Sequence, residues 1–283
     1  MQKKILGYAV YPQSVKILRE KSNLVQPKPQ QTPHKQAISS FTDASKRRLK
    51  FVASNSTPKL VSQFCLTYHK RWNLDGRAVK KHLNTFLQNL RNHYKEIKYL
   101  WILEFQTSGM PHFHLFLSAP STTLGLQEFM AIGWNRITEE TPEHLRFHSH
   151  PKNFIAWNMG NGSYLSHKYL SKESQKKVPE NFLFVGRFWG ASRSLVSPPE
   201  IHCSDDLDFI QVDNVNPQTG EVTKTPTTQY IHRALCKFHE KRLQVFGFTS
   251  KVRYLTTCIM LSASAGIFNR CLEYVQVHGN QLF

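Results

Sequence analysis

The middle of the chain alternates between two hydrophobic periods. Residues 60–69, LVSQFCLTYH, alternate as a half-buried strand does, and residues 97–105 and 111–118 are two further strand-like runs. Residues 106–111, with Gly109, predict a short turn that makes the last two strands antiparallel neighbours. Between the first and second strands, apolar residues form one stripe of a predicted helix: Val79, Leu83, Phe86, Leu87, Leu90 and Tyr94.

Two more segments have helical spacing. Residues 163–174, SYLSHKYLSKES, predict one helix, and residues 124–137 predict another from the positions of Leu126, Phe129, Met130, Gly133, Trp134 and Ile137. The order strand, helix, strand, strand, helix, helix predicts an α+β fold. In it, an antiparallel sheet carries helices on one face and leaves the other face open for a ligand.

The flanking regions differ in composition from this core. Residues 22–36 are rich in Pro and Gln, as a linker or extended arm is, and the basic segment 44–55 suits a helix with a solvated or phosphate-contacting face. A helix is predicted from Thr228, with an apolar side of Ile231, Leu235, Phe238 and Val245. Residues 254–268 are too short and polar for a membrane span and predict a core helix.

These features divide the chain into three parts. We expect a basic N-terminal extension and linker (1–58), a central domain (59–195) and a small, mainly helical C-terminal region (196–283). No signal peptide is predicted, and no membrane partner.

Charge and cysteine content narrow the function. The chain has 37 Lys and Arg against 19 Asp and Glu, a net charge of +18 over 283 residues. This excess favours a nucleic-acid partner over a basic surface that only keeps the protein soluble. The five cysteines are odd in number and form no CxxC pair, which argues against a disulfide framework or thiolate zinc site and favours reduced thiols in a cytoplasm.

The strand at 111–118 carries two histidines on one side. Residues i and i+2 of a strand point the same way, so His112 and His114 can share one divalent cation. With 14 histidines in the chain, one such pair is expected by chance. A second pair, His148 and His150, lies in a polar stretch, and we assign it no function.

Glu104 strengthens the case for the first pair. It lies on the adjacent predicted strand just before the turn, so the hairpin would bring its carboxylate beside the two imidazoles. One carboxylate and two histidines form a mixed oxygen and nitrogen site suited to Mg²⁺ or Mn²⁺. The alternative is a solvated carboxylate at a strand end.

The helix at 163–174 carries a second group with chemical potential. Tyr164 and Tyr169 are accompanied by Lys168 and Lys172, and Tyr169 and Lys172 are neighbours on a helix. A tyrosine hydroxyl, with a pKa of about 10, needs nearby positive charge to act as a nucleophile. Taken alone, the same residues also describe packed aromatics beside solvated lysines.

Three segments in order carry a family resemblance: FCLTYH (64–69), PHFHLFL (111–117) with Glu104 upstream, and YLSHKYLSK (164–172). The set resembles the HUH endonuclease superfamily, specifically the rolling-circle replication initiators (Rep proteins) of plasmids and phages. In these proteins a strand ending in LTY precedes a His-hydrophobic-His strand and a helix with Tyr-x-x-Lys. The resemblance covers residues 59–195, where GRFWGASRSL (186–195) also resembles the segment after the tyrosine motif, and it implies an HUH/RRM-like sheet.

The resemblance also implies roles for individual residues. His112, His114 and Glu104 would ligate Mg²⁺ or Mn²⁺, Tyr169 would be the nucleophile, and Lys172 would assist it. Two-tyrosine members place their tyrosines four residues apart, whereas here the spacing is five. Tyr164 is therefore a second nucleophile, a packing residue, or the nucleophile itself with Tyr169 structural; we favour Tyr169.

The implied activity is a metal-dependent nickase-ligase in a bacterial host cytoplasm. The tyrosine would form a 5′-phosphotyrosine with single-stranded or origin DNA and free a 3′-OH that primes replication. No GxxxxGK[ST] loop is present, so a host helicase and a host polymerase would be partners. The alternatives are an HUH single-strand transposase or relaxase, and a non-catalytic module that binds single-stranded nucleic acid.

Overall fold

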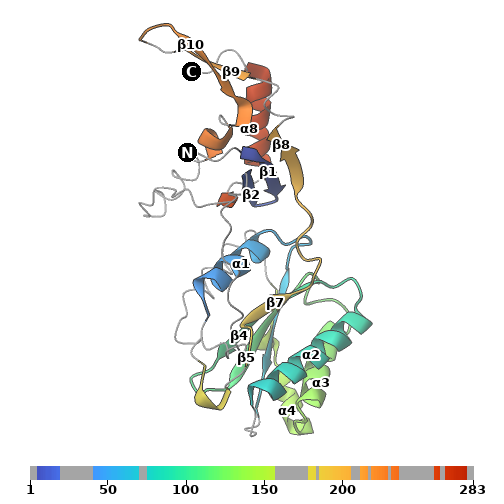
Figure 1. Ribbon diagram of the computed structural model, residues 1–283. Coiled ribbons are helices and arrows are strands. Elements are labelled where there is room, and N and C mark those ends of the chain that lie inside the picture. The colour runs from blue at the N-terminus through green and yellow to red at the C-terminus, as the bar shows by residue number, and fades with distance from the viewer. Residues whose placement is uncertain are drawn as a thin grey trace. The chain divides into compact units, whose positions relative to one another are not determined.

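The structure is a computed structural model that describes residues 5–19, 41–69, 75–156, 178–182, 185–204, 211–215, 218–228, 231–235, 258–261 and 265–278. The chain divides into two compact units, Gln31–Val196 and Met1–Gln30 with Ser197–Phe283. The elements, in chain order, are β1 (Ile5–Tyr11), β2 (Ser14–Arg19), α1 (Asp43–Ser54), β3 (Ser62–Thr67), α2 (Gly76–His93), β4 (Tyr99–Phe105), β5 (Pro111–Leu117), α3 (Leu126–Ile137), α4 (Pro142–His148), η1 (Pro151–Asn153), β6 (Phe154–Ala156), η3 (Glu180–Phe182), β7 (Trp189–Ala191), β8 (Glu200–Cys203), β9 (Gln211–Val215), β10 (Val222–Pro226), β11 (Cys258–Leu261) and α8 (Ala265–His278) (Figure 1).

The unit Gln31–Val196 is built on a five-stranded antiparallel sheet in the order β6-β3-β5-β4-β7. The predicted hairpin is confirmed, because β4 and β5 pair from Tyr99 opposite Leu117 to Phe105 opposite Pro111. All seven residues of β4 are buried, as expected of a strand inside the sheet. The predicted α+β class, with an antiparallel sheet and helices, is therefore confirmed.

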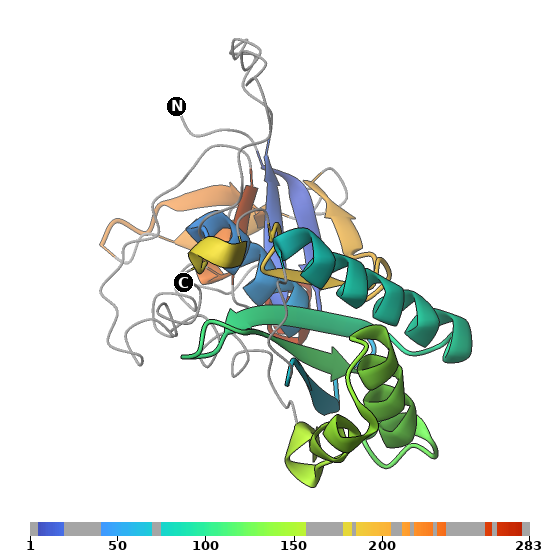
Figure 2. The same cartoon turned by 90° about the horizontal axis from the view of Figure 1, so that it is seen from below.

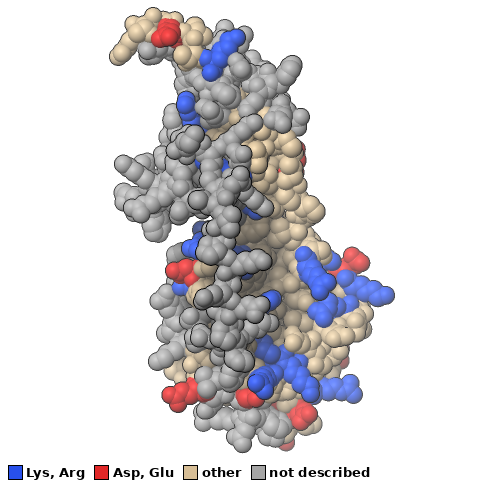
Figure 3. Space-filling view, in the orientation of Figure 1, with Lys and Arg blue, Asp and Glu red and all other residues tan. Residues whose placement is uncertain are grey.

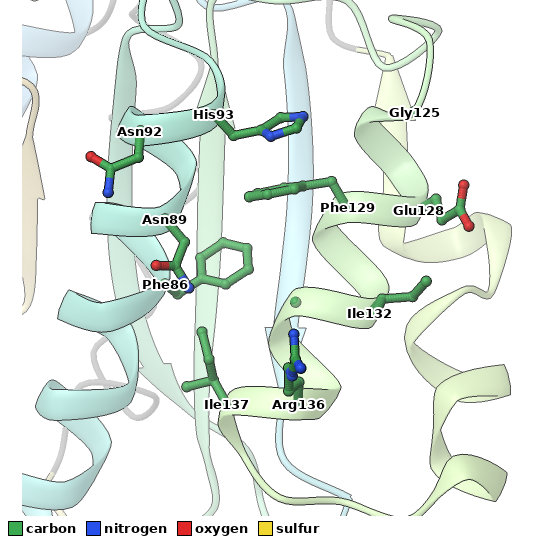
Figure 4. A pocket seen from close by; sticks show the side chains of 11 residues that line it. Phe86, Asn89, Asn92, His93, Gly125, Glu128, Phe129, Ile132, Arg136 and Ile137 are labelled. Carbon is green, nitrogen blue, oxygen red and sulfur yellow. The ribbon is translucent and has the colours of Figure 1, made fainter.

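Helices α2 and α3 pack together on one face of this sheet (Figure 4). The predicted stripe of α2 is buried from Val79 to Leu90, and the Asp75 carboxylate caps the helix by accepting a bond from the Ala78 N–H at 2.7 Å. Trp134 of α3, fully buried, meets the rings of Phe86 and Phe113 edge-on, with centroids 5.5 and 6.1 Å away. Its indole N–H donates to the Thr67 carbonyl at 2.8 Å, which ties α3 to the end of β3.

The opposite face of the sheet is not bare. On β4 and β5 the side chains of Leu100, Ile102 and Phe116 point to that face and are fully buried. The expectation of an open face therefore does not hold at these positions. Helix α1, suggested by the basic segment 44–55, is confirmed, and its Leu49 and Ala53 belong to the same core as the sheet.

The unit formed by Met1–Gln30 and Ser197–Phe283 has a sheet of its own, in the order β11-β2-β1-β8. The N-terminal segment, expected to be an extension, forms the hairpin β1–β2. Beside α8, the region expected to be mainly helical contains strands β8, β9, β10 and β11. A small core joins β1 and β2 to the C-terminal part: Tyr8, Val10, Val15, Ile17, Ile231, Leu235 and Phe268.

The C-terminal predictions have mixed outcomes. Ile231 and Leu235 are fully buried in helical backbone, as predicted, whereas Phe238 and Val245 lie outside the described residues. The predicted core helix at 254–268 is wrong at Cys258–Leu261, which is β11 and pairs with β2. A short apolar run has no period that separates a buried strand from a helix. None of the helices within the described ranges has the length and hydropathy to cross a bilayer.

Replacing Gly190 by Ala should destabilise the unit Gln31–Val196. Gly190 of β7 lies opposite Trp101 of β4, and an added Cβ would lie 2.8 Å from the indole nitrogen. The ring cannot easily withdraw, because the Lys80 ammonium lies over it at 4.1 Å. We expect Gly190→Ala to lower the free energy of unfolding by about 1–3 kcal/mol, measured by urea denaturation.

Gly133→Ala is the matched control, because the nearest atom to its Cβ would be on the Phe86 ring at 3.4 Å. This residue is inside α3, where Ala stabilises a helix by about 0.5–1 kcal/mol relative to Gly. Equal stability of Gly190→Ala and wild type would contradict the close packing of β7 on Trp101.

Candidate functional site

The candidate site lies where β3, β5 and β4 run side by side. Strand β5 is central, and pairing on both sides aligns its residues with those of its neighbours. Paired residues point to the same face, and Phe113, between the histidines, points to the α3 side. The face opposite α2 and α3 therefore carries two rows of side chains: Thr67–His112–Glu104 and Cys65–His114–Ile102.

The two histidines of β5 are in contact, as the sequence predicted. The ring centroids of His112 and His114 are 4.5 Å apart and the rings are nearly perpendicular, at 76°. His112 is half-buried, and His114 is 9% exposed. The imidazoles are thus largely shielded from bulk water, which strengthens any electrostatic interaction that they make.

Glu104 lies beside the histidines, also as predicted. It is opposite His112 in the register, and its Oε2 is 3.2 Å from Nε2 of His114. Only 3% of Glu104 is exposed. A carboxylate buried to this degree requires hydrogen bonds or a positive charge close by, and the neighbouring imidazole supplies the contact seen here.

Two side chains of β3 hold the other nitrogen of each ring. The Gln63 amide nitrogen is 2.9 Å from Nδ1 of His114, and the Thr67 hydroxyl is 3.0 Å from Nδ1 of His112. An amide nitrogen can only donate, so Nδ1 of His114 accepts and the ring proton lies on Nε2, toward Glu104. This is the kind of support that fixes ring orientation in metal sites. The sequence analysis missed both residues.

Cys65 is a second side chain that the sequence analysis did not foresee at this site. Its Sγ is 3.6 Å from Nδ1 of His114, and ligand atoms of Cys65, His112 and His114 all lie within 4.8 Å of one another. His114 therefore has Glu104 at its Nε2 edge and Cys65 at its Nδ1 edge. Which edge carries a cation would decide whether a carboxylate or a thiolate completes the site.

The predicted tyrosine helix lies outside the described residues. Tyr164, Lys168, Tyr169 and Lys172 all fall in the segment 157–177. Their assignment as nucleophile and helpers remains a prediction.

Two cavities lie away from the histidine pair. One, of about 630 Å³, opens between α2 and α3 and is lined by Phe86, His93, Phe129 and Arg136 among others (Figure 4). The other, of about 600 Å³, lies between α1 and the segment 187–196. The second is the more basic of the two, because Arg48, Arg187 and Arg193 line it together with the aromatic residues Phe51 and Trp189.

Lys and Arg side chains also gather over α2 in Figure 3. The exposed basic residues Arg77 and Lys81 lie near the start of this helix, and Arg91 and Lys95 lie near its end. Lys80 differs from them, because burial lowers the pKa of its ammonium to about 7. Since α2 packs on the sheet face opposite the histidines, this positive surface is not the surface that surrounds His112 and His114.

The matched family agrees with this geometry. Residues 61–174 match the model of a family of replication-associated proteins, the ORF2 type. The match contains β3, β4 and β5, and therefore every side chain of the two rows described above. It supports a role for the chain in the initiation of replication. No curated protein and no solved structure gave a significant match.

Proposed function

We propose that the chain is a replication initiator that nicks and rejoins origin DNA through a tyrosine, as HUH endonucleases do. One observation carries the proposal. Within the segment that matches the replication-associated family, His112, His114 and Glu104 meet on one face of the sheet, with 3.2 Å between Glu104 and His114.

The residues present suit a divalent cation. Nε2 of His114 and Oε2 of Glu104 already face each other, and the Nδ1 atoms of both rings are engaged by Gln63 and Thr67. The two Nε2 atoms and the Glu104 carboxylate would therefore hold the ion, Mg²⁺ or Mn²⁺. When bound, it would polarise the scissile phosphate and offset the charge that develops in the transition state.

Tyr169 is proposed as the nucleophile. Its hydroxyl loses a proton and forms a bond to phosphorus, while the bond from phosphorus to the 3′ oxygen breaks and that oxygen takes up a proton. The 5′ end stays on the enzyme as a phosphotyrosine, and the reverse reaction rejoins the strand. Lys172 would favour the tyrosinate, and Tyr164, with Lys168, is the alternative.

The groove beside α1 is the best described path for the DNA strand. Arg48, Arg187 and Arg193 supply charge for phosphates, and Trp189 and Phe51 supply rings for stacking with bases. The groove borders β7, which pairs with β4, the strand that carries Glu104. A strand bound there would approach the sheet that holds the histidines.

The first test is a covalent adduct between the protein and DNA. We would incubate the chain with Mn²⁺ and a pool of labelled single-stranded oligonucleotides, isolate the adduct, and map the modified peptide by mass spectrometry. The expected adduct is on Tyr169 and disappears in Tyr169→Phe, because the nucleophilic oxygen is then missing. Tyr164→Phe, the matched variant on the same predicted helix, should retain it.

The remaining outcomes separate the alternatives. An adduct on Tyr164 would overturn the choice of nucleophile but keep the reaction. DNA binding without any adduct in Mn²⁺ would favour the non-catalytic module and overturn the proposal.

The second test asks which side chain completes the cation site. If the ion lies at the Nε2 edge of His114, Glu104→Gln removes a charged ligand, and the rate of adduct formation should fall at least about 100-fold. Cys65→Ser keeps the size of its side chain and should change the rate less than about threefold. Calorimetric titration with Mn²⁺ should show the same order. A larger loss in Cys65→Ser than in Glu104→Gln would move the cation to the other edge of the ring.

A further inference from the structure

A second group of metal-ligating side chains lies where β3 ends and α4 begins its packing on α3. It consists of His69, Glu140 and His148, whose ligand atoms all lie within 4.8 Å of one another. His69 comes two residues after the end of β3, Glu140 lies in the connection between α3 and α4, and His148 is the last residue of α4. The helices α3 and α4 lie next to each other in both views of the molecule (Figures 1 and 2).

The chain is shaped so that Glu140 points inward. After α3 ends at Ile137, Glu139 adopts a left-handed backbone with φ 53, which is uncommon for a residue other than glycine. The following N–H, of Glu140, donates back to the Asn135 carbonyl at 3.1 Å. Glu140 is consequently only 7% exposed, although it lies in a connection between two helices.

Both oxygens of this carboxylate have a defined contact. Oε1 accepts a hydrogen bond from the backbone N–H of His69 at 2.7 Å. Oε2 lies 2.8 Å from Nε2 of His148, a residue that is 4% exposed. One oxygen therefore orients the carboxylate, and the other forms a buried pair with an imidazole, which is how ligating carboxylates are held in metal sites.

His69 completes the group from the solvent side. Its ring centroid is 4.6 Å from that of His148, and the His69 residue is exposed. Burial of the ring and the neighbouring His148 both lower the pKa of His69. The neutral imidazole that results has a lone pair with which it can bind a cation.

We propose that His69, Glu140 and His148 form a second cation site, which takes a divalent transition metal, zinc in particular, and fastens the end of β3 to α4. Two imidazoles and one carboxylate are a ligand set that zinc accepts with water as its fourth ligand. The exposed side of His69 leaves space for that water. Mg²⁺ prefers oxygen ligands and would compete poorly.

The distances are close to those that a shared ion requires. Two ligand atoms bound to one zinc in tetrahedral geometry lie about 3.3 Å apart, given bond lengths of about 2.0–2.1 Å. The observed 2.8 Å between Glu140 and His148 is that of a hydrogen bond, in which a proton lies where the ion would bind. Replacing the proton by zinc requires a small separation of these two atoms and a small rotation of the exposed His69 ring.

The site would act on the strand that supports His112. Thr67, two residues before His69, contacts Nδ1 of His112, and its carbonyl accepts from Trp134 of α3. A zinc ion at His69 would add a second link between the end of β3 and the helices. The expected contribution is to stability, not to the reaction.

Zinc retention tests the proposal in the full-length chain. The protein would be stripped with a chelator, incubated with Zn²⁺ in excess Mg²⁺ and desalted, and its zinc measured by mass spectrometry. His69→Gln should lower the zinc content by about one ion per chain relative to wild type. His150→Gln, an exposed neighbour that lies outside the group, should leave the content unchanged.

Thermal unfolding provides the second readout. Zinc should raise the midpoint of wild type and of His150→Gln, and raise that of His69→Gln clearly less. Equal zinc content in His69→Gln and wild type would overturn the site, and zinc binding that leaves the midpoint unchanged would overturn its role as a fastening. Adduct formation in Mn²⁺ should persist in His69→Gln, so failure of this proposal is distinguishable from failure of the proposed nicking reaction.

Discussion

The register of β5 between β3 and β4 is the constraint on which the candidate site depends. A shift by one residue would turn His112 and His114 toward α3 and bring Phe113 to the opposite face. The core prevents that shift, because Phe113, Leu115 and Leu117 are fully buried on the helix side. Hydrophobic packing against the helices, far from any chemistry, therefore decides that the imidazoles and Glu104 share one face.

The same register explains why the site offers two cation positions. His114 has a neighbour on each side, β4 with Glu104 and β3 with Cys65, and its two nitrogens face different neighbours. Gln63 donates to Nδ1, which occupies the cysteine side with a hydrogen bond and leaves Nε2 for the carboxylate side. The structure in this way favours a hard, oxygen-containing site over a thiolate one.

The sequence predicted those parts of the fold that have strong local signals. The stripe of α2 and the hairpin β4–β5 follow from periodicity and a glycine turn, and Glu104 was placed beside the histidines by that hairpin alone. Gln63, Cys65 and Thr67 were missed, because nothing local states that β3 pairs with β5. The hairpin β1–β2 was missed for a similar reason, since its partners β8 and β11 come some 180 residues or more later in the chain.

The histidine-rich stretch shows the same limit. His148 and His150 look alike in sequence, yet His150 is exposed, whereas His148 is buried against Glu140. Only the fold of α3 and α4 distinguishes them. The tyrosines have strong sequence signals but lie outside the described residues, so their case rests on the family resemblance and the match over residues 61–174.

The central claim is that a cation binds between the histidine pair and Glu104. Anomalous diffraction from crystals soaked in Mn²⁺ tests it most directly. The account predicts a peak within bonding distance of Nε2 of His114, Glu104 and His112. A peak on the Cys65 side of the ring, or none in this region at saturating Mn²⁺, would contradict it.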